Sequence, residues 1–293
     1  MADFKNKVVY QIYPKSFKDS NGDGMGDLRG VAEKLVYLAD MGVDYLWLTP
    51  FFVSPQKDNG YDVADYLDID PHFGTMADFD TLVQAADAKG LKIMLDMVLC
   101  HTSDQHARFQ RALSGDEKYQ RYYILRDGRN KKSADDPGEP PTNWQCAFGG
   151  SAWQWEPRLR KWYLHLHDVS QPDLDWTNPN VREELANVVR FWKERGVAGF
   201  RFDVINLIAK PEVFADDTKG LGRRLFADGP HIHEYLRELV QNAGIDDMMT
   251  VGEMASTDLE NCIHYTRPAN HELSMAFNFH HLKVDYKDGA SRR

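Results

Sequence analysis

Apolar residues in this chain gather in short runs that alternate with longer stretches of helical periodicity. The short runs have the length and composition of buried strands and cover residues 8–14, 44–50, 91–98, 197–204, 248–253 and 273–279. The periodic stretches place their apolar positions on one helix face and cover residues 27–41, 76–89, 181–195 and 232–241. Strands and helices alternating at this rhythm predict a parallel sheet wrapped by helices.

The rhythm breaks once, after the third predicted strand. Residues 102–176 are rich in Trp, Tyr, Gly and Pro, and the polar run 126–141 has no periodicity. We expect a small inserted domain there. The predicted organisation is an N-terminal barrel segment with strands one to three over residues 1–101, the inserted domain over 102–176, and a C-terminal barrel segment with strands four to six over 177–293.

Two charged residues, Arg201 and Asp203, interrupt the apolar run 197–204. Spaced two apart on a strand, they point to the same face, and in apolar surroundings each is costly to bury unless it is paired or functional. A structural ion pair at the strand end is the alternative interpretation.

Other unusual polar residues also fall near the carboxyl ends of predicted strands: Asp62, Asp96, His101 and Glu253. An eight-stranded α/β barrel places its chemistry at these ends, so the pattern predicts a (β/α)8 TIM barrel. An open doubly wound sheet also uses strand ends, but no Gly-x-Gly-x-x-Gly follows the first strand.

Asp203 and Glu253, on neighbouring predicted strands, are the pair of carboxylates that a retaining glycosidase requires. One attacks the anomeric carbon, and the other protonates the leaving oxygen and later deprotonates water. We expect Arg201 to keep Asp203 ionised and burial to hold the proton on Glu253. Two unrelated strand-end acids are the alternative.

Four segments, in order and register, resemble the signature regions of the α-amylase family, glycoside hydrolase family 13, in its oligosaccharide-cleaving branch. They are residues 96–101, 171–176, 199–203 and 251–253, and the likeness runs from about residue 9 to residue 286. The resemblance implies a (β/α) barrel with an insertion after strand three, with Asp203 as nucleophile and Glu253 as general acid/base. It also implies that Tyr61, Asp62, His101 and Arg201 hold the non-reducing sugar.

The sequence departs from the family pattern in two places. Cys100 stands where the family commonly has an Asn that helps to hold calcium, which argues against calcium at that position. The family's last catalytic aspartate follows strand seven in an Asn-His-Asp motif, and no such motif follows Glu253. We therefore expect a barrel truncated after strand six, the N-terminal portion of a longer enzyme.

A glycine-rich acidic loop precedes the first periodic stretch. Side-chain oxygens alternate along it, with glycine at its sixth position, and its candidate ligands are Asp19, Asn21, Asp23, the carbonyl of Met25 and Asp27. Such a loop wraps a hard divalent cation, here a structural calcium in preference to magnesium. The same loop recurs in the family's oligosaccharide-cleaving branch. A solvated acidic turn is the alternative.

Two features suggest which glucoside is cleaved. Val204, after Asp203, resembles the members that cleave α-1,6 and α-1,1 bonds. His280, His281 and Lys283 cluster beyond the last predicted strand and suit a phosphate group, as in members that hydrolyse trehalose 6-phosphate. The alternatives are an oligo-1,6-glucosidase or dextran glucosidase, a catalytically incomplete fragment of either, glucosyl transfer through the same intermediate, and a non-catalytic family member.

Composition narrows the partners. The 293 residues carry a formal net charge of -10, which argues against nucleic acid or an anionic membrane as a partner. No apolar run approaches membrane-spanning length. The three cysteines have no disulfide or zinc spacing, so we expect a cytoplasmic protein. The small disaccharide phosphate is the partner that the resemblance implies. The sequence does not set the oligomeric state.

Overall fold

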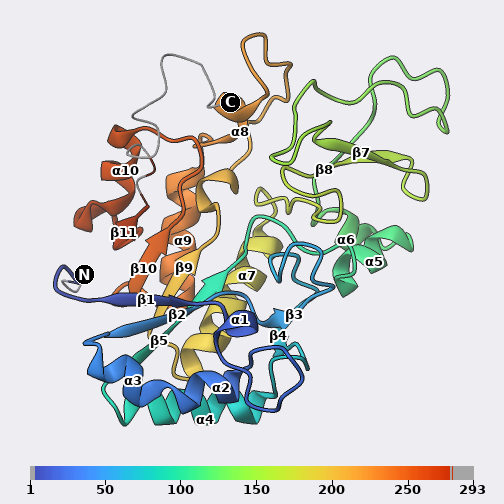
Figure 1. The fold of residues 1–293 in the computed structure, drawn as a ribbon. Coiled ribbons are helices and arrows are strands. Elements are labelled where there is room, and N and C mark those ends of the chain that lie inside the picture. Colours follow the sequence, from blue (N-terminus) through green and yellow to red (C-terminus); the bar gives the residue numbers. More distant parts are fainter. Residues whose placement is uncertain (1–3, 278, 280–293) are drawn as a thin grey trace, which may run out of the picture.

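Six parallel strands form an open half-barrel in the computed structural model, which describes residues 4–277 and 279 (Figure 1). Their order across the sheet is β1-β2-β5-β9-β10-β11. The strands are β1 (Val9–Ile12), β2 (Tyr45–Leu48), β5 (Lys92–Met97), β9 (Gly199–Phe202), β10 (Met249–Gly252) and β11 (Met275–Ala276). All six strand predictions are confirmed, and so is the truncated (β/α) barrel as the fold class.

Helices connect the strands, as the alternating pattern predicts. They are α1 (Pro14–Phe17), α2 (Leu28–Glu33), α3 (Leu35–Asp40), α4 (Met76–Asp87), α7 (Pro179–Glu194), α8 (Arg223–Phe226), α9 (Ile232–Ala243) and α10 (Leu259–Thr266), with 3-10 turns η1 (Ile205–Leu207) and η2 (Pro268–Asn270). The prediction of one helix over residues 27–41 was wrong. The backbone leaves helical geometry at Lys34 (φ −99°, ψ 3°), which divides the stretch into α2 and α3.

The segment between β5 and β9 folds away from the barrel sheet. It contains α5 (Ala107–Leu113) and α6 (Glu117–Gln120), followed by an antiparallel sheet in the order β6-β8-β7. These strands are β6 (Leu125–Arg126), β7 (Trp153–Glu156) and β8 (Lys161–Leu164). A small hairpin of β3 (Phe52–Val53) and β4 (Asp65–Ile69), which the sequence pattern did not reveal, follows β2.

Trp192 of α7 anchors one region of the core. Its buried indole packs against the rings of Phe51, Phe52 and Phe79 at centroid distances of 6.0, 5.3 and 5.1 Å. Its Nε1 donates a hydrogen bond to the Tyr66 carbonyl at 2.8 Å, so the polar atom is satisfied inside the apolar cluster. This contact ties the helix before β9 to the hairpin after β2, and so supports the strand that carries Arg201.

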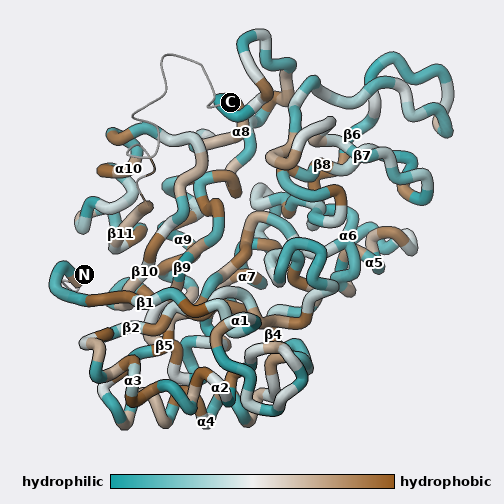
Figure 2. The backbone as a smooth tube through the Cα atoms, viewed as in Figure 1, coloured by the Kyte–Doolittle hydropathy of each residue, from teal (hydrophilic) through white to brown (hydrophobic). Residues whose placement is uncertain are grey.

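Hydrophobic positions concentrate along the central strands, and the loops at their carboxyl ends are more polar (Figure 2). This distribution is expected of a parallel sheet buried on both faces. None of the helices among the described residues combines the length and apolar character needed to span a bilayer.

Candidate active site

Arg201 lies at the centre of a buried charge cluster at the carboxyl ends of three neighbouring strands. In the register of the sheet it stands opposite Asp96 on β5 and Val251 on β10. Its Nη1 donates to Asp96 Oδ1 at 2.5 Å and to Asp203 Oδ1 at 2.8 Å, and its Nη2 pairs with Glu253. One guanidinium therefore holds both predicted catalytic carboxylates and a third that the sequence placed nearby.

The cluster contains three carboxyl groups and one cation, so it favours keeping a proton. Burial, together with the nearby charge of Asp203, raises the pKa of Glu253 to about 7, although Arg201 acts in the opposite direction. The direction agrees with the expectation from sequence. Near neutral pH Glu253 can therefore carry the proton that a general acid must deliver.

Aromatic side chains close the other sides of the cluster. The Tyr61 hydroxyl donates to Asp96 Oδ2 at 3.0 Å, and Trp47 Nε1 donates to the same oxygen at 3.2 Å. The Arg201 guanidinium lies 5.3 Å from the Trp47 ring and 5.7 Å from the Tyr61 ring. These contacts fix the guanidinium in position. Beside it lies a cavity of about 470 Å³, whose lining includes Trp47, Arg201 and Phe277.

Val204 turns the chain immediately after Asp203. Its φ of 35° lies in the left-handed region, which a β-branched residue rarely adopts. Hydrogen bonds hold it there: Leu207 N–H donates to the Val204 carbonyl at 2.9 Å, and Ile205 N–H donates to the Glu253 carbonyl at 3.1 Å. The turn therefore links the backbone positions of the two carboxylates directly.

His101 lies beside Tyr61 and is almost fully buried. Its Nε2 is 3.1 Å from the Tyr61 carbonyl and 3.2 Å from Gln171 Nε2, and its Nδ1 has no partner among the described residues. His167, which sequence reasoning missed, lies with its ring centroid 5.0 Å from that of His101. Burial and the neighbouring His101 lower the pKa of His167 to about 4, so it is neutral at pH 7.

Asp62 is fully buried next to Tyr61, but its carboxylate is occupied by its own loop. Oδ1 accepts from Ser54 Oγ and Asp58 N, each at 3.0 Å, and Oδ2 accepts from Lys57 N at 2.9 Å. In this structure Asp62 therefore shapes the loop after β3. A role in sugar binding stays a prediction.

Lys210 occupies the position beside Cys100 where the sequence argued against calcium. Its buried Nζ lies 2.7 Å from Asp173 Oδ1, 2.5 Å from the Leu207 carbonyl and 3.6 Å from Cys100 Sγ. Asp173 precedes α7, Cys100 follows β5, and Lys210 follows η1. A side-chain ammonium thus joins these three segments, and the sequence had not singled it out because a lone lysine after a strand carries no pattern.

The predicted cation loop curls its side-chain oxygens inward. Asp19 Oδ1 accepts from Asn21 N at 3.0 Å and Gly22 N at 2.6 Å, and Oδ2 accepts from Gly24 N at 2.8 Å. These bonds, from Gly24 and Gly22 above all, lower the pKa of Asp19 and keep it anionic. Asn21 Oδ1 accepts from Asp23 N at 2.9 Å. Asp19, Asn21 and Asp23 thus offer pre-oriented hard oxygens, which suit calcium.

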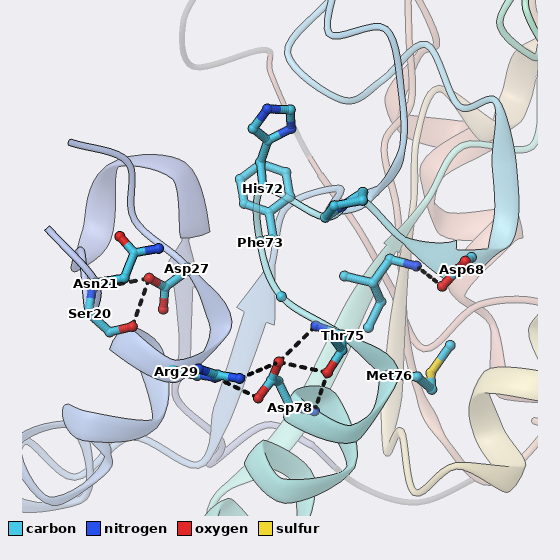
Figure 3. A pocket seen from close by; sticks show the side chains of 13 residues that line it. Ser20, Asn21, Asp27, Arg29, Asp68, His72, Phe73, Thr75, Met76 and Asp78 are labelled. Atoms are coloured by element: carbon cyan, nitrogen blue, oxygen red, sulfur yellow. Dashed lines mark hydrogen bonds and ion pairs between the residues drawn. The ribbon is translucent and has the colours of Figure 1, made fainter. Parts of the chain in front are cut away.

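Asp27 has a different role in the structure. It is the N-cap of α2, with Oδ1 accepting from Gly30 N at 2.7 Å and Oδ2 accepting from Ser20 N at 3.0 Å. Figure 3 shows its carboxylate turned to Ser20 at the edge of a cavity of about 400 Å³, across which Arg29 reaches Asp78. Ser20 Oγ also donates to Oδ2 at 2.9 Å, so only Oδ1 keeps a free lone pair, and the geometry of the carboxylate is set by the helix end.

The predicted phosphate-binding residues His280, His281 and Lys283 lie outside the described residues. Of the other predicted substrate-binding residues, Arg201 and Tyr61 converge on the carboxylate cluster, whereas the polar atoms of His101 contact the Tyr61 backbone and Gln171. Asp96, Trp47, His167 and Gln171 complete the site without having been assigned roles from the sequence. Asp96 was expected at a strand end but without a role, and Trp47 could have been found in the same way from its position near the end of β2.

Parallel strands that carry a guanidinium-linked pair of carboxylates at their carboxyl ends define a (β/α)-barrel catalytic domain of the kind found in glycoside hydrolases. The family model of the alpha amylase catalytic domain matches residues 11–293, and the chain belongs to this family.

Several relatives and solved structures resemble the chain over nearly its whole length. It is 54% identical over 287 residues to the trehalose-6-phosphate hydrolase of Escherichia coli K12, covering 98% of this chain and 51% of that protein. An oligo-1,6-glucosidase of Bacillus cereus is 45% identical over 293 residues, with 98% and 51% covered. The crystal structure of Bacillus licheniformis trehalose-6-phosphate hydrolase superposes with a TM-score of 0.92 at 50% identity, covering 98% of this chain and 51% of that one. The chain spans about half the length of these relatives.

Proposed function

We propose that this chain belongs to the catalytic domain of a retaining α-glucoside hydrolase that cleaves trehalose 6-phosphate to glucose and glucose 6-phosphate. The observation that carries the proposal is the pairing of Asp203 and Glu253 through Arg201 at the ends of adjacent strands. The identity of 54% to the Escherichia coli hydrolase, against 45% for the Bacillus cereus glucosidase, supports the phosphorylated substrate.

The chemistry follows from the roles of the two carboxyl groups. Asp203 attacks the anomeric carbon while the bond from that carbon to the bridging oxygen breaks, and Glu253 transfers its proton to that oxygen, releasing glucose 6-phosphate. Glu253, now ionised, takes a proton from water. The resulting hydroxide attacks the same carbon and displaces Asp203, releasing glucose with its configuration retained.

Arg201 and its aromatic neighbours position the nucleophile in this scheme. The bond of 2.8 Å from Arg201 to Asp203 fixes one carboxylate oxygen, which leaves the other to attack. Tyr61, His101 and Asp62 are proposed to hold the glucosyl unit, and His280, His281 and Lys283 the phosphate. The three cysteines are buried and free, in keeping with a cytoplasmic location.

The substrate proposal is tested by comparing trehalose 6-phosphate, trehalose and isomaltose as substrates. The assay uses this chain and, because its relatives are about twice as long, a chimera completed with the C-terminal half of the Escherichia coli relative. We expect the phosphorylated sugar to be preferred. Lys283→Ala should raise its KM about 10–100-fold, the cost of one charge-assisted bond to phosphate, with trehalose kinetics unchanged.

Lys287→Ala, four positions further along, is the matched control and should leave all three substrates unaffected. A preference for isomaltose with no effect of Lys283→Ala would replace the proposal with an oligo-1,6-glucosidase, for which the 45% identity to the Bacillus cereus enzyme is the supporting observation.

We further propose that Asp19, Asn21, Asp23 and the Met25 carbonyl hold a structural calcium ion, with Asp27 as an outer contact and magnesium as the weaker alternative. The ion would cross-link the loop before α2 and would take no part in the reaction. Its binding to the folded state alone would stabilise the protein by about 2.7 kcal/mol at a calcium concentration 100 times Kd.

The measurement is the melting temperature with excess EDTA and after calcium is restored. Calcium should raise Tm in the wild type, and Asp23→Asn should remove most of the rise. Asp136→Asn is the control, because Asp136 is also a loop aspartate whose two carboxylate oxygens each accept a hydrogen bond from within its own loop. An identical calcium response in wild type and Asp23→Asn would overturn the site.

A further inference from the structure

Away from the Arg201 cluster, two histidines and a glutamate converge from three elements at the outer side of the last βα units. His233 lies in the first turn of α9, His264 in the last turn of α10, and Glu272 between η2 and β11. One ligand atom from each residue lies within 4.8 Å of the others. Figure 1 shows α9, α10 and β11 gathered at the same end of the sheet.

Glu272 is the buried member of this trio. Its side chain is 0% exposed, and an isolated carboxylate would not be stable there. Oε1 accepts from Arg237 Nη1 at 3.0 Å, and Oε2 lies 2.8 Å from His233 Nδ1. Arg237, one turn beyond His233 on α9, therefore balances the charge and turns Oε2 to the histidines, as partners behind metal ligands commonly do.

The two imidazoles lie unusually close together. Their ring centroids are 3.9 Å apart with the planes tilted by 36°, and the Tyr265 ring packs against His233 at 4.8 Å. This approach brings one nitrogen of each ring within 4.8 Å of the other and of a Glu272 carboxylate oxygen. Among the described residues no side-chain hydrogen bond engages the ring nitrogens of His264, so its lone pair is available.

We propose that His233, His264 and Glu272 form a binding site for a divalent transition-metal ion, with zinc as the preferred occupant. Two imidazole nitrogens and one carboxylate oxygen are a donor set that zinc accepts in tetrahedral geometry, with water as the fourth ligand. The ion displaces the proton between His233 Nδ1 and Glu272 Oε2, while Arg237 keeps its bond to the other oxygen.

The site differs from the loop at Asp19 in both chemistry and consequence. Imidazoles select zinc over calcium, whereas the loop offers oxygens only. The zinc ion would join α9, α10 and the segment that enters β11. Since α10 follows Glu253 along the chain, the site would stabilise the segment from α10 to β11, which comes directly after the proposed general acid.

The test is calorimetric titration of the chelator-stripped protein with Zn²⁺, in parallel with Ca²⁺, together with the Tm at equimolar Zn²⁺. We expect one zinc ion per chain and, with the calcium concentration held constant, a rise in Tm on adding zinc that is lost in His264→Ala. His264→Ala should weaken zinc binding by at least about 10-fold. This variant leaves the ion pairs of Glu272 intact, so a folding defect does not obscure the result.

His271→Ala is the matched control, because His271 also pairs with a carboxylate, Asp246 at 3.0 Å, but has no second histidine beside it among the described residues. Substitution with Co²⁺ gives an independent signal: the visible absorption of a tetrahedral cobalt site should appear in wild type and His271→Ala and be absent in His264→Ala. Absence of zinc binding, or equal binding in wild type and His264→Ala, would overturn the site and leave a structural ion-pair network.

Discussion

Replacing Glu253 with glutamine is expected to lower kcat for trehalose 6-phosphate by about 10²–10⁴-fold, because the amide can neither protonate the bridging oxygen nor activate water. The side chain keeps its shape, so KM should change little. A p-nitrophenyl glucoside, whose leaving group needs no protonation, should form the covalent intermediate at a nearly unchanged rate. The measurement is a comparison of burst and steady-state rates on both substrates in the completed enzyme.

The ionisation of Glu253 should also determine how kcat falls on the alkaline side of the pH profile. The pKa of Glu253 is raised to about 7 by burial and by Asp203, and the acid acts in its protonated form, so kcat should fall as the pH rises above 7. Glu260→Gln is the control, because Glu260 is an exposed glutamate of α10. It should keep the wild-type kcat and the wild-type fall of kcat at alkaline pH. Full activity of Glu253→Gln on trehalose 6-phosphate would remove Glu253 from the mechanism.

Replacing Lys210 with methionine is expected to destabilise the fold by about 3–5 kcal/mol, because it leaves the carboxylate of Asp173 buried without its cation. Asp173 is 0% exposed and retains only hydrogen-bond donors such as Leu166 N at 2.7 Å. The change is measured by urea unfolding. The double variant Lys210→Met, Asp173→Asn removes both charges and should recover much of the loss.

The loss of stability caused by Lys210→Met depends on pH, and the pKa of Asp173 determines the direction of that dependence. Burial alone would raise the pKa of Asp173, but Lys210 and His101 bring it below its ordinary value. A carboxyl with a lowered pKa adds stability above its unfolded pKa and loses that stability as the pH falls through the folded pKa. The difference between wild type and Lys210→Met should therefore persist down to a pH of about 4, the unfolded pKa of an aspartate, and narrow below it.

Lys92→Met is the control for this variant. Lys92 pairs with Asp87 at 2.5 Å, but both side chains are exposed, so the loss should stay below about 1 kcal/mol. If the two lysine substitutions destabilise the protein equally, Lys210 does not act by compensating the buried charge of Asp173.

The sequence predicts the sheet well because the apolar composition of each short run indicates by itself that the run is a buried strand. The run around Arg201 and Asp203 shows a continuous apolar segment with one charged pair, and parallel strands place their carboxyl ends together. From these facts alone Arg201, Asp203 and Glu253 were expected to meet, and the structure brings them within direct contact.

Contacts between segments far apart in sequence could not be predicted in the same way. His167 and Asp173 lie beside His101 and Lys210 only because the end of the segment between β5 and β9 returns to the loop after β5. Lys34 interrupts a periodic stretch without any glycine or proline to mark the break. The left-handed turn at Val204 runs against its local preference, since the surrounding hydrogen bonds impose it.

Lys210 and the calcium ion proposed for the loop at Asp19 are two different sources of positive charge for buried or clustered carboxylates. An ammonium attached to the chain has no dissociation constant: chelators, dilution and competing ions cannot remove it, and it is present from the moment the chain is made. With the calcium ion proposed for it, the loop would instead depend on the ion content of its surroundings. Depletion of divalent ions would then loosen the region before α2, while the contacts of Lys210 between β5, η1 and α7 would stay in place.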